Sequence, residues 1–268
     1  IVPTRQQSPK LSRKVVTVMK HRNKRNVSKL IKRGICAFLS TLLIASGPVL
    51  ASDAPHSHIF AANRSAGKYV AITFDDGPHP VYTEKILAIL AENHAKATFF
   101  VVGQNAERYP ELITKEFEAG HEIGNHTYSH PNMKKIGVSE AIAEIERTQE
   151  IVHDITGVYP KVFRSPGGIF SDELVSAVEG ISCKPVSWSW RQDTRDWSKP
   201  PVETVIRTVL DNLRDGDIIL FHDFNTKGSP TPDALAVILP ELVKRGYSFV
   251  TVSELSTLKD GVCTLEQT

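Results

Sequence analysis

Cysteine is scarce in this sequence, with three among 268 residues. So few cysteines exclude a disulfide-rich scaffold, and none lies beside histidines at the spacing of a cysteine-ligated zinc site. Glycine and proline number 16 each and follow no repeat, which excludes a collagen-like chain. With 41% hydrophobic and 23% charged residues, the composition is that of an ordinary globular protein.

Acidic residues are absent from the first 51 positions, which contain 11 Lys and Arg. Residues 52–268 contain the other 21 basic residues against all 30 acidic ones, a formal charge of −9, although the whole chain sums to +2. A basic segment ahead of an acidic body indicates a targeting segment rather than a nucleic-acid-binding surface. We therefore expect no nucleic acid among the partners.

One long apolar run is present, at residues 35–51. A cationic segment that starts at Met19 precedes it, and small residues end it at Ala51, which is the layout of a secretory signal peptide. A Gly-Pro pair interrupts the run, which is short for a membrane span. We predict a signal peptide at 19–51, cleaved near Ala51, and hence a secreted, periplasmic or cell-wall-associated protein. An uncleaved N-terminal membrane anchor is the alternative.

The segments around the signal peptide have no periodic pattern. Residues 1–18 precede the only plausible start methionine and are interpreted as an upstream segment, and residues 52–67 as a linker. The remaining 68–268 are predicted to form a single domain. Export would leave Cys183 and Cys263 in an oxidising compartment, where they either pair or stay as two free thiols.

Short β-rich runs alternate with helical patterns along the body of the chain. Strands are predicted at 69–74, 97–102, 121–124, 161–164, 184–187, 217–221 and 248–252. Helices are predicted at 81–93, 110–119, 139–156, 171–179, 202–213 and 233–245, the third capped by Ser139. This alternation predicts an α/β fold of parallel βαβ units, either a (β/α) barrel or a doubly wound sheet. In both folds the ligands bind at the carboxyl ends of the strands.

An acid pair follows the first predicted strand, in the run Asp75-Asp76-Gly77-Pro78. The simpler interpretation is a surface turn without a function, since Asp, Gly and Pro favour turns. Two adjacent carboxylates after a buried strand repel each other unless a cation or a proton lies nearby. One of them can therefore bind a metal while the other faces a water molecule.

A histidine pair follows the third predicted strand, at His126 and His130. The i, i+4 spacing puts both on one face of a helical turn, within reach of one metal ion. Taken alone, two surface histidines are the simpler interpretation. With an Asp from another strand end they form a two-histidine, one-carboxylate site with open positions, as catalytic zinc requires.

Three later strand ends are also unusual. Arg164 leaves the fourth strand and can hold a carboxylate ionised through paired hydrogen bonds. Three tryptophans follow the fifth strand, at Trp188, Trp190 and Trp197, where they form either a sugar-stacking wall or part of the core. The sixth strand ends at His222, which is either catalytic or structural. All five segments are expected on one edge of the sheet.

In this order the segments resemble the five motifs of the polysaccharide deacetylases, carbohydrate esterase family 4. They are TFDDGP (73–78), HTYSH (126–130), RSPGG (164–168), DTRDW (193–197) and IILFH (218–222). The resemblance spans about residues 69–256. It implies a distorted (β/α) barrel of about seven parallel strands in a single catalytic domain. It also implies a divalent metal, usually zinc, with cobalt, nickel or manganese as alternatives.

The resemblance further implies an activity and the residues that perform it. The implied reaction is hydrolysis of acetyl groups on N-acetylglucosamine polymers of the cell-wall or chitin type, or on O-acetylated xylan. The implied metal ligands are Asp76, His126 and His130. The implied catalytic residues are Asp75 as base, Arg164 as its partner, His222 as acid and Asp196 as the carboxylate that tunes His222. The implied substrate-binding residues are Pro166, Gly167, Trp197 and Leu220.

One position departs from the family pattern, because many members carry an aromatic residue where this chain has Gly167. The change leaves the backbone N–H in place but removes a wall of the groove, so it bears on the substrate's shape rather than on the chemistry. We expect a monomer that acts on a polysaccharide or oligosaccharide and meets a membrane only through an uncleaved signal segment. A catalytically silent carbohydrate-binding module is the alternative, which needs neither the base nor the acid.

Overall fold

The computed structural model describes residues 58–226, 228–259 and 262–263, so the predicted signal peptide and the segment ahead of it lie outside the described residues. The strands are β1 (Tyr69–Asp75), β2 (Ala97–Val101), β3 (Glu122–Asn125), β4 (Val162–Phe163), β5 (Lys184–Pro185), β6 (Ile218–His222), β7 (Ser248–Phe249), β8 (Leu258–Lys259) and β9 (Val262–Cys263). The helices are α1 (Tyr82–Glu92), α2 (Gly103–Arg108), α3 (Pro110–Glu118), α4 (Val138–Thr156), α5 (Asp172–Gly180), α6 (Val202–Leu210), α7 (Thr231–Lys244) and α8 (Val252–Thr257). Short 3-10 turns lie at η1 (Pro166–Gly168), η2 (Trp190–Gln192) and η3 (Asp196–Ser198).

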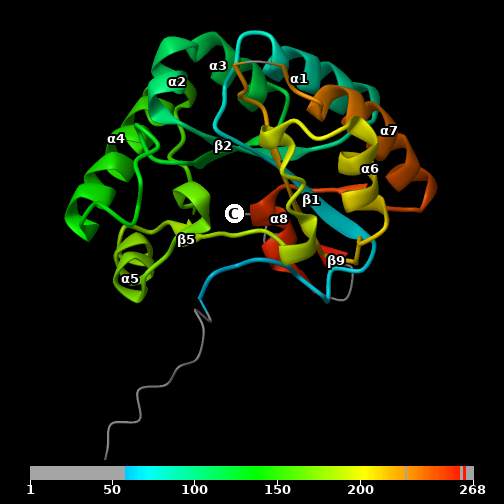
Figure 1. The fold of residues 1–268 in the computed structure, drawn as a ribbon. Coiled ribbons are helices and arrows are strands. Elements are labelled where there is room, and N and C mark those ends of the chain that lie inside the picture. The colour runs from blue at the N-terminus through cyan, green and yellow to red at the C-terminus, as the bar shows by residue number, and fades with distance from the viewer. Residues whose placement is uncertain (1–57, 227, 260–261, 264–268) are drawn as a thin grey trace, which may run out of the picture. The chain divides into compact units, whose positions relative to one another are not determined.

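Seven of the strands form one curled sheet in which every pairing is parallel. Their order is β5-β4-β3-β2-β1-β6, and β7 pairs with the beginning of β1. Helices follow one another around the outer side of this half-barrel, while α8 lies on the inner side (Figure 1). The predicted distorted (β/α) barrel of about seven parallel strands is therefore confirmed.

The alternation of side chains along β1 explains the two faces of the sheet. Val70, Ile72 and Phe74 are fully buried in the large core between the sheet and the outer helices. Ala71 points the other way, into a second core that α8 closes on the inner side. Because a strand residue faces the opposite side from its neighbour, Asp75 falls on the inner side with Ala71. The inner side is thus apolar at one end and polar where the strands finish.

The predicted elements agree with the observed ones apart from their ends, two short helices and the two-residue strands β8 and β9, which were not predicted. The six-residue helices α2 and α8 were not predicted, because six residues are too few to display a helical period. The predicted cap at Ser139 is wrong: α4 begins at Val138 after Gly137, whose backbone is extended, and no side chain caps it.

The predicted linker differs from the structure in its second half. Phe60 forms a parallel bridge to Val186, and Ala62 forms an antiparallel bridge to Asp217. The side chain of Asn63 donates hydrogen bonds to two carbonyls, that of Leu255 in α8 and that of Leu258 just after this helix. This part of the chain packs on the domain, although its small polar residues showed no periodicity.

Two further expectations concern the cysteines and the membrane. Cys183 is a free, buried thiol, and burial raises its pKa to about 12. The side chain of Cys263 lies outside the described residues. Among the helices that the structure describes, none combines the length and the apolar character that a membrane crossing needs.

Candidate active site

Four chemically active side chains lie where parallel strands end on the inner side of the sheet. Asp75 closes β1 and is paired in register with His222, which closes β6. His126 directly follows β3 and Arg164 directly follows β4. The sequence prediction that these segments converge on one edge is confirmed.

Asp75 and Arg164 form a buried ion pair. Arg164 Nη1 lies 2.7 Å from Asp75 Oδ1 and 2.8 Å from Thr73 Oγ1, and Nη2 donates to the Ser187 carbonyl at 3.0 Å. The guanidinium carbon lies 4.0 Å from the centroid of the Phe100 ring, so the cation also stacks on an aromatic face. These contacts fix the Asp75 carboxylate in one orientation.

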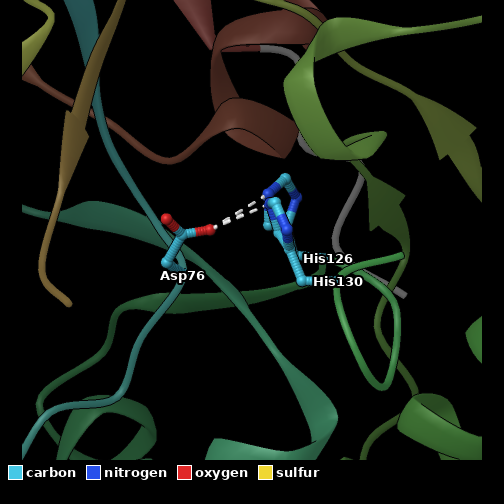
Figure 2. A group of neighbouring side chains, drawn as sticks. All are labelled: Asp76, His126 and His130. Atoms are coloured by element: carbon cyan, nitrogen blue, oxygen red, sulfur yellow. Dashed lines mark ion pairs between the residues drawn. The ribbon is translucent and has the colours of Figure 1, made fainter. Parts of the chain in front are cut away.

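Asp76, His126 and His130 form a second group beside this pair (Figure 2). Asp76 Oδ1 lies 3.5 Å from His126 Nε2 and 3.3 Å from His130 Nε2. Burial raises the pKa of Asp76, but the hydrogen bond and charge of His126, with the charges of His222 and His130, outweigh it and lower that pKa to about 2. The carboxylate is therefore ionised at neutral pH, as a metal ligand must be.

The backbone around these three residues is not the helical turn that the sequence predicted for the histidines. Residues 126–130 form an irregular loop in which Thr127 (φ 67°) and His130 (φ 53°) are left-handed. Asp76 is left-handed as well (φ 76°). The two histidines still reach one point, although loop geometry rather than a helical face brings them there.

The donor set fits a divalent metal. One carboxylate and two imidazoles are the ligands of many catalytic zinc sites, and one ligand atom from each lies within 4.8 Å of the others. Asp76 Oδ1 is buried, and its nearest polar neighbours are the Nε2 atoms of the same two histidines, so it points to the place that a shared metal would take. His126 Nδ1 lies 2.8 Å from the Arg164 carbonyl, which directs Nε2 toward the group.

His222 and Asp196 form a dyad, and His222 lines the same cavity as the ligand group. His222 Nδ1 lies 2.7 Å from Asp196 Oδ1, and the His222 backbone N–H donates to Asp196 Oδ2 at 2.8 Å. Asp196 also accepts hydrogen bonds from the Thr231 hydroxyl and the Trp197 backbone N–H. Burial lowers the pKa of His222, but its bond to Asp196 and the nearby carboxylate charges raise it to about 9. His222 is therefore protonated at neutral pH.

A cavity of about 580 Å³ brings most of the predicted residues together. Its lining consists of Asp75, Asp76, His126, His130, Gly167, Trp188, Asp193, Arg195, Trp197, Leu220 and His222. Arg164 and Asp196 lie buried behind this lining. Pro166 is buried too and does not line the cavity, so its place as a substrate contact stays a prediction.

Turn η1 contains Gly167, the position at which many family members carry an aromatic residue. A Cβ built on Gly167 would meet nothing closer than Ile169 Cδ1 at 3.5 Å, so that side of the cavity is open. A Cβ on Gly168 would lie 2.7 Å from Trp188 Cη2, so the Trp188 ring packs directly on this glycine. Trp188 thus supplies an aromatic wall near the place where the expected side chain is missing.

Sequence reasoning missed three polar residues that support the site. Thr231 binds Asp196, and Asn105 binds the Asp76 carbonyl. Asp223 is buried beside Gly77, and burial with the charge of Asp76 raises its pKa to about 7. The position of Asp223 next to His222, at a strand end, was the available signal. Thr231 and Asn105 lie on helices, and their positions in the sequence gave no signal of a role in the site.

A larger cavity, of about 780 Å³, lies at the amino ends of β4 and β5. Phe60, Cys183 and Lys184 are among the residues that line it, and none of the predicted site residues does. The chemically active groups therefore lie at the carboxyl ends of the strands, as in other parallel α/β folds.

Comparison with known proteins supports the same assignment. The sequence profile of the polysaccharide deacetylase family matches residues 62–186. A peptidoglycan-N-acetylglucosamine deacetylase of Bacillus cereus is 41% identical over 198 residues, which cover 72% of this chain and 90% of the relative. A chitooligosaccharide deacetylase of Azorhizobium caulinodans is 39% identical over 191 residues, which cover 67% of this chain and 90% of the relative.

A solved structure shares the fold as well. The family 4 acetyl xylan esterase from Clostridium thermocellum, in complex with a cobalt ion, superposes with a TM-score of 0.66 at 38% identity. The superposition covers 71% of this chain and 91% of that structure. Motifs, fold and relatives agree, and the chain belongs to the polysaccharide deacetylase family, carbohydrate esterase family 4.

Proposed function

We propose that this protein is a metal-dependent hydrolase that removes acetyl groups from N-acetylglucosamine residues of a cell-wall or chitin-type polysaccharide. The observation that carries the proposal is the arrangement of one cavity. A three-residue ligand group shares one cavity with a carboxylate paired with Arg164 and with a histidine paired with Asp196. Amide hydrolysis needs a base, an acid and a positive charge that stabilises the negative charge developing on the carbonyl oxygen. These groups, with a bound metal, can supply all three.

Asp76, His126 and His130 would hold the metal, for which we propose zinc, with cobalt, nickel or manganese as alternatives. Two imidazoles and one carboxylate suit zinc, and the metal in the related esterase structure is cobalt. A divalent metal at this position would lower the pKa of a water molecule and polarise the acetyl carbonyl.

Asp75 would act as the general base. Its Oδ1 is occupied by Arg164, while Oδ2 lies 3.8 Å from His126 Nε2 and so faces the ligand group. Oδ2 is therefore the oxygen placed to take a proton from the attacking water. Arg164 would hold the carboxyl group in this orientation while Oδ2 takes the proton.

His222 would act as the general acid. Its Nδ1 is bound to Asp196, so the proton on Nε2 is the one available to the departing nitrogen. Asp196 fixes the tautomer and stabilises the charged ring. A sugar amine leaves only after its nitrogen is protonated, whereas the alcohol of an ester is a better leaving group. A general acid held in place by Asp196 therefore matters more for an amide than for an ester.

The remaining cavity residues would bind the acetyl group and the sugar. Trp197 and Leu220 line the cavity with apolar surface that suits the acetyl methyl. A backbone N–H near Gly167 would help to hold the oxyanion, a contribution typically worth about 3 kcal/mol. The open space over Gly167 and the ring of Trp188 would shape the groove along the polymer.

Two alternatives are kept: an O-acetyl-xylan esterase of the same fold and a silent carbohydrate-binding module. The related xylan esterase structure favours the first. The silent module does not account for the buried ion pair of Asp75 and Arg164, since binding a sugar does not require a buried charge pair. We also propose that the protein is exported, acts as a monomer, and meets a membrane only if its signal segment is not cleaved.

An acetate-release assay on three substrates tests the proposal. Purified protein would be incubated with peptidoglycan, chitin oligomers and acetylxylan, before and after chelation and after readdition of zinc, with metal content measured in parallel. We expect zinc-dependent acetate release from an N-acetylglucosamine polymer. Release from acetylxylan alone would favour the esterase, and binding to a glycan without release from any substrate would favour the silent module.

A further inference from the structure

The connection between β2 and α2 contacts the turn that carries Asp76. Together with the last residue of β2 and the first turn of α2, the connection makes up residues 101–105, called here the 101–105 segment. The Val102 backbone N–H donates to the Gly77 carbonyl at 3.0 Å. Asn105 Nδ2 donates to the Asp76 carbonyl at 2.7 Å. One side of the segment therefore holds the backbone of the carboxylate ligand.

The other side of the 101–105 segment contacts the loop that carries the two histidines. The Val101 carbonyl accepts from the His126 backbone N–H at 3.0 Å. Gly103 and Gln104 donate their backbone N–H groups to the carbonyls that follow His126, at 2.9 Å each. The segment thus joins the two backbones whose side chains meet in Figure 2.

Asp76 needs such support because its backbone is left-handed, with φ 76°. That conformation is uncommon for residues other than glycine, so contacts with the neighbouring structure help to maintain it. Asn105 is well placed to do so, because its own backbone is fixed. Its N–H donates to the Val102 carbonyl at 2.9 Å, and its carbonyl accepts from the Tyr109 N–H at 2.9 Å.

We propose that Asn105 is a positioning residue that sets the metal affinity of Asp76, His126 and His130 by holding the Asp76 backbone. The inference rests on the proposed function only in that these three residues bind a divalent metal. Asn105 does not line the cavity, so it acts through Asp76 rather than on the substrate. Contacts of this kind behind a metal ligand commonly change metal affinity or activity by about 10–100-fold.

Zinc affinity of the apoprotein, measured by competition with a chromophoric chelator, tests the proposal directly. N105A and N105D both remove the donor, and N105D preserves the side chain's size should N105A fail to fold. We expect each to weaken zinc binding by about 10-fold or more. The matched control is N93A, which removes the same kind of bond, from Asn93 Nδ2 to the Ile89 carbonyl at 2.8 Å, at the end of α1. N93A should bind zinc as the wild type does.

Gly103→Ala disturbs the same segment from its other side. A Cβ at Gly103 would lie 2.5 Å from Thr148 Oγ1 on α4 and 2.8 Å from Tyr128 Cδ2 in the histidine loop, so the 101–105 segment and these neighbours have to move apart. Weaker zinc binding in this variant supports the proposal. Wild-type zinc affinity in both Asn105 variants overturns it. Tight zinc binding by the wild type without acetate release would defeat the proposed function but leave this test intact, and no zinc binding at all would defeat both.

Discussion

At the scale of single residues, the site separates two adjacent carboxylates into different roles. Asp75 is the last residue of β1 and lies against Arg164, while Asp76 turns away in a left-handed conformation toward two histidines. Their chemistry is the same and their surroundings differ. The repulsion expected between adjacent acids is relieved separately, by a guanidinium for one and by imidazoles for the other.

Asp75→Asn tests this division of roles. The amide keeps the size of the side chain but cannot take a proton, so acetate release should fall by about 10²–10⁴-fold. Bound zinc should stay stoichiometric, because Asp76 and both histidines are unchanged. His126→Ala is the contrast, and it should lose metal and activity together. Near-wild-type acetate release by D75N, measured at equal zinc content, would show that the base is another group.

The pKa of His222 predicts the pH above which kcat should fall. Its pKa lies above the usual 6.5, at about 9, so the acid form is complete at low pH and is lost as the pH rises through that value. A bound divalent cation opposes a positive charge nearby, so the falling limb of kcat is expected at or below pH 9.

Asp196→Asn should move this limb downward. The substitution removes the largest interaction that raises the pKa of His222, so the limb should shift by about one pH unit or more toward acid. The pH dependence of kcat in the wild type and in D196N is the measurement. An unchanged limb in D196N would exclude His222 as the titrating acid.

The residues that sequence could predict are those whose type alone suggests chemistry. An acid pair, a histidine pair and a histidine at strand ends were recognisable because parallel strands bring their ends to one edge. Asn105 and Thr231 were not, because each acts through one hydrogen bond to a residue far away in sequence. Such contacts exist only once the fold has formed.

At the scale of elements, apolar runs in the sequence predicted the strands of the sheet, while short or irregular segments were not predicted correctly. β1 and β6 are continuous apolar runs and were predicted within one or two residues. The histidine loop was expected as a helical turn from its i, i+4 spacing, but left-handed residues such as Thr127 break the period. Spacing predicts proximity here, while the backbone path depends on contacts with the 101–105 segment.

Helix α8 offers a test at this scale. Thr251 and Glu254 form a capping box at its start, and Leu255 packs into the inner core of the sheet. Thr251→Ala should lower the free energy of unfolding by about 1 kcal/mol, measured by urea denaturation. Zinc affinity and kcat should not change, because α8 lies beneath the inner core and lines no part of the catalytic cavity. A loss of activity in folded T251A would mean that α8 and the site are coupled.

At the scale of the whole chain, charge divides the sequence into a basic first part and an acidic body. The isoelectric point of about 8.4 belongs to both parts together. Without its first 51 residues the chain would carry a formal charge of −9 and an acidic isoelectric point. Several of those acids lie in the cavity, where bound metal and Arg164 would offset part of their charge.

The division of charge leads to a test of export. Expressed in a secreting bacterium, the chain should be recovered outside the cytoplasm with Ser52 as its first residue, because small residues up to Ala51 form a cleavage site. Intact mass and N-terminal sequencing measure this, and isoelectric focusing should show the acidic form. Ala51→Arg should block cleavage, since the processing site requires a small residue there. An uncut wild-type chain in the membrane fraction would support the anchor instead, and a wild-type chain confined to the cytoplasm would contradict both.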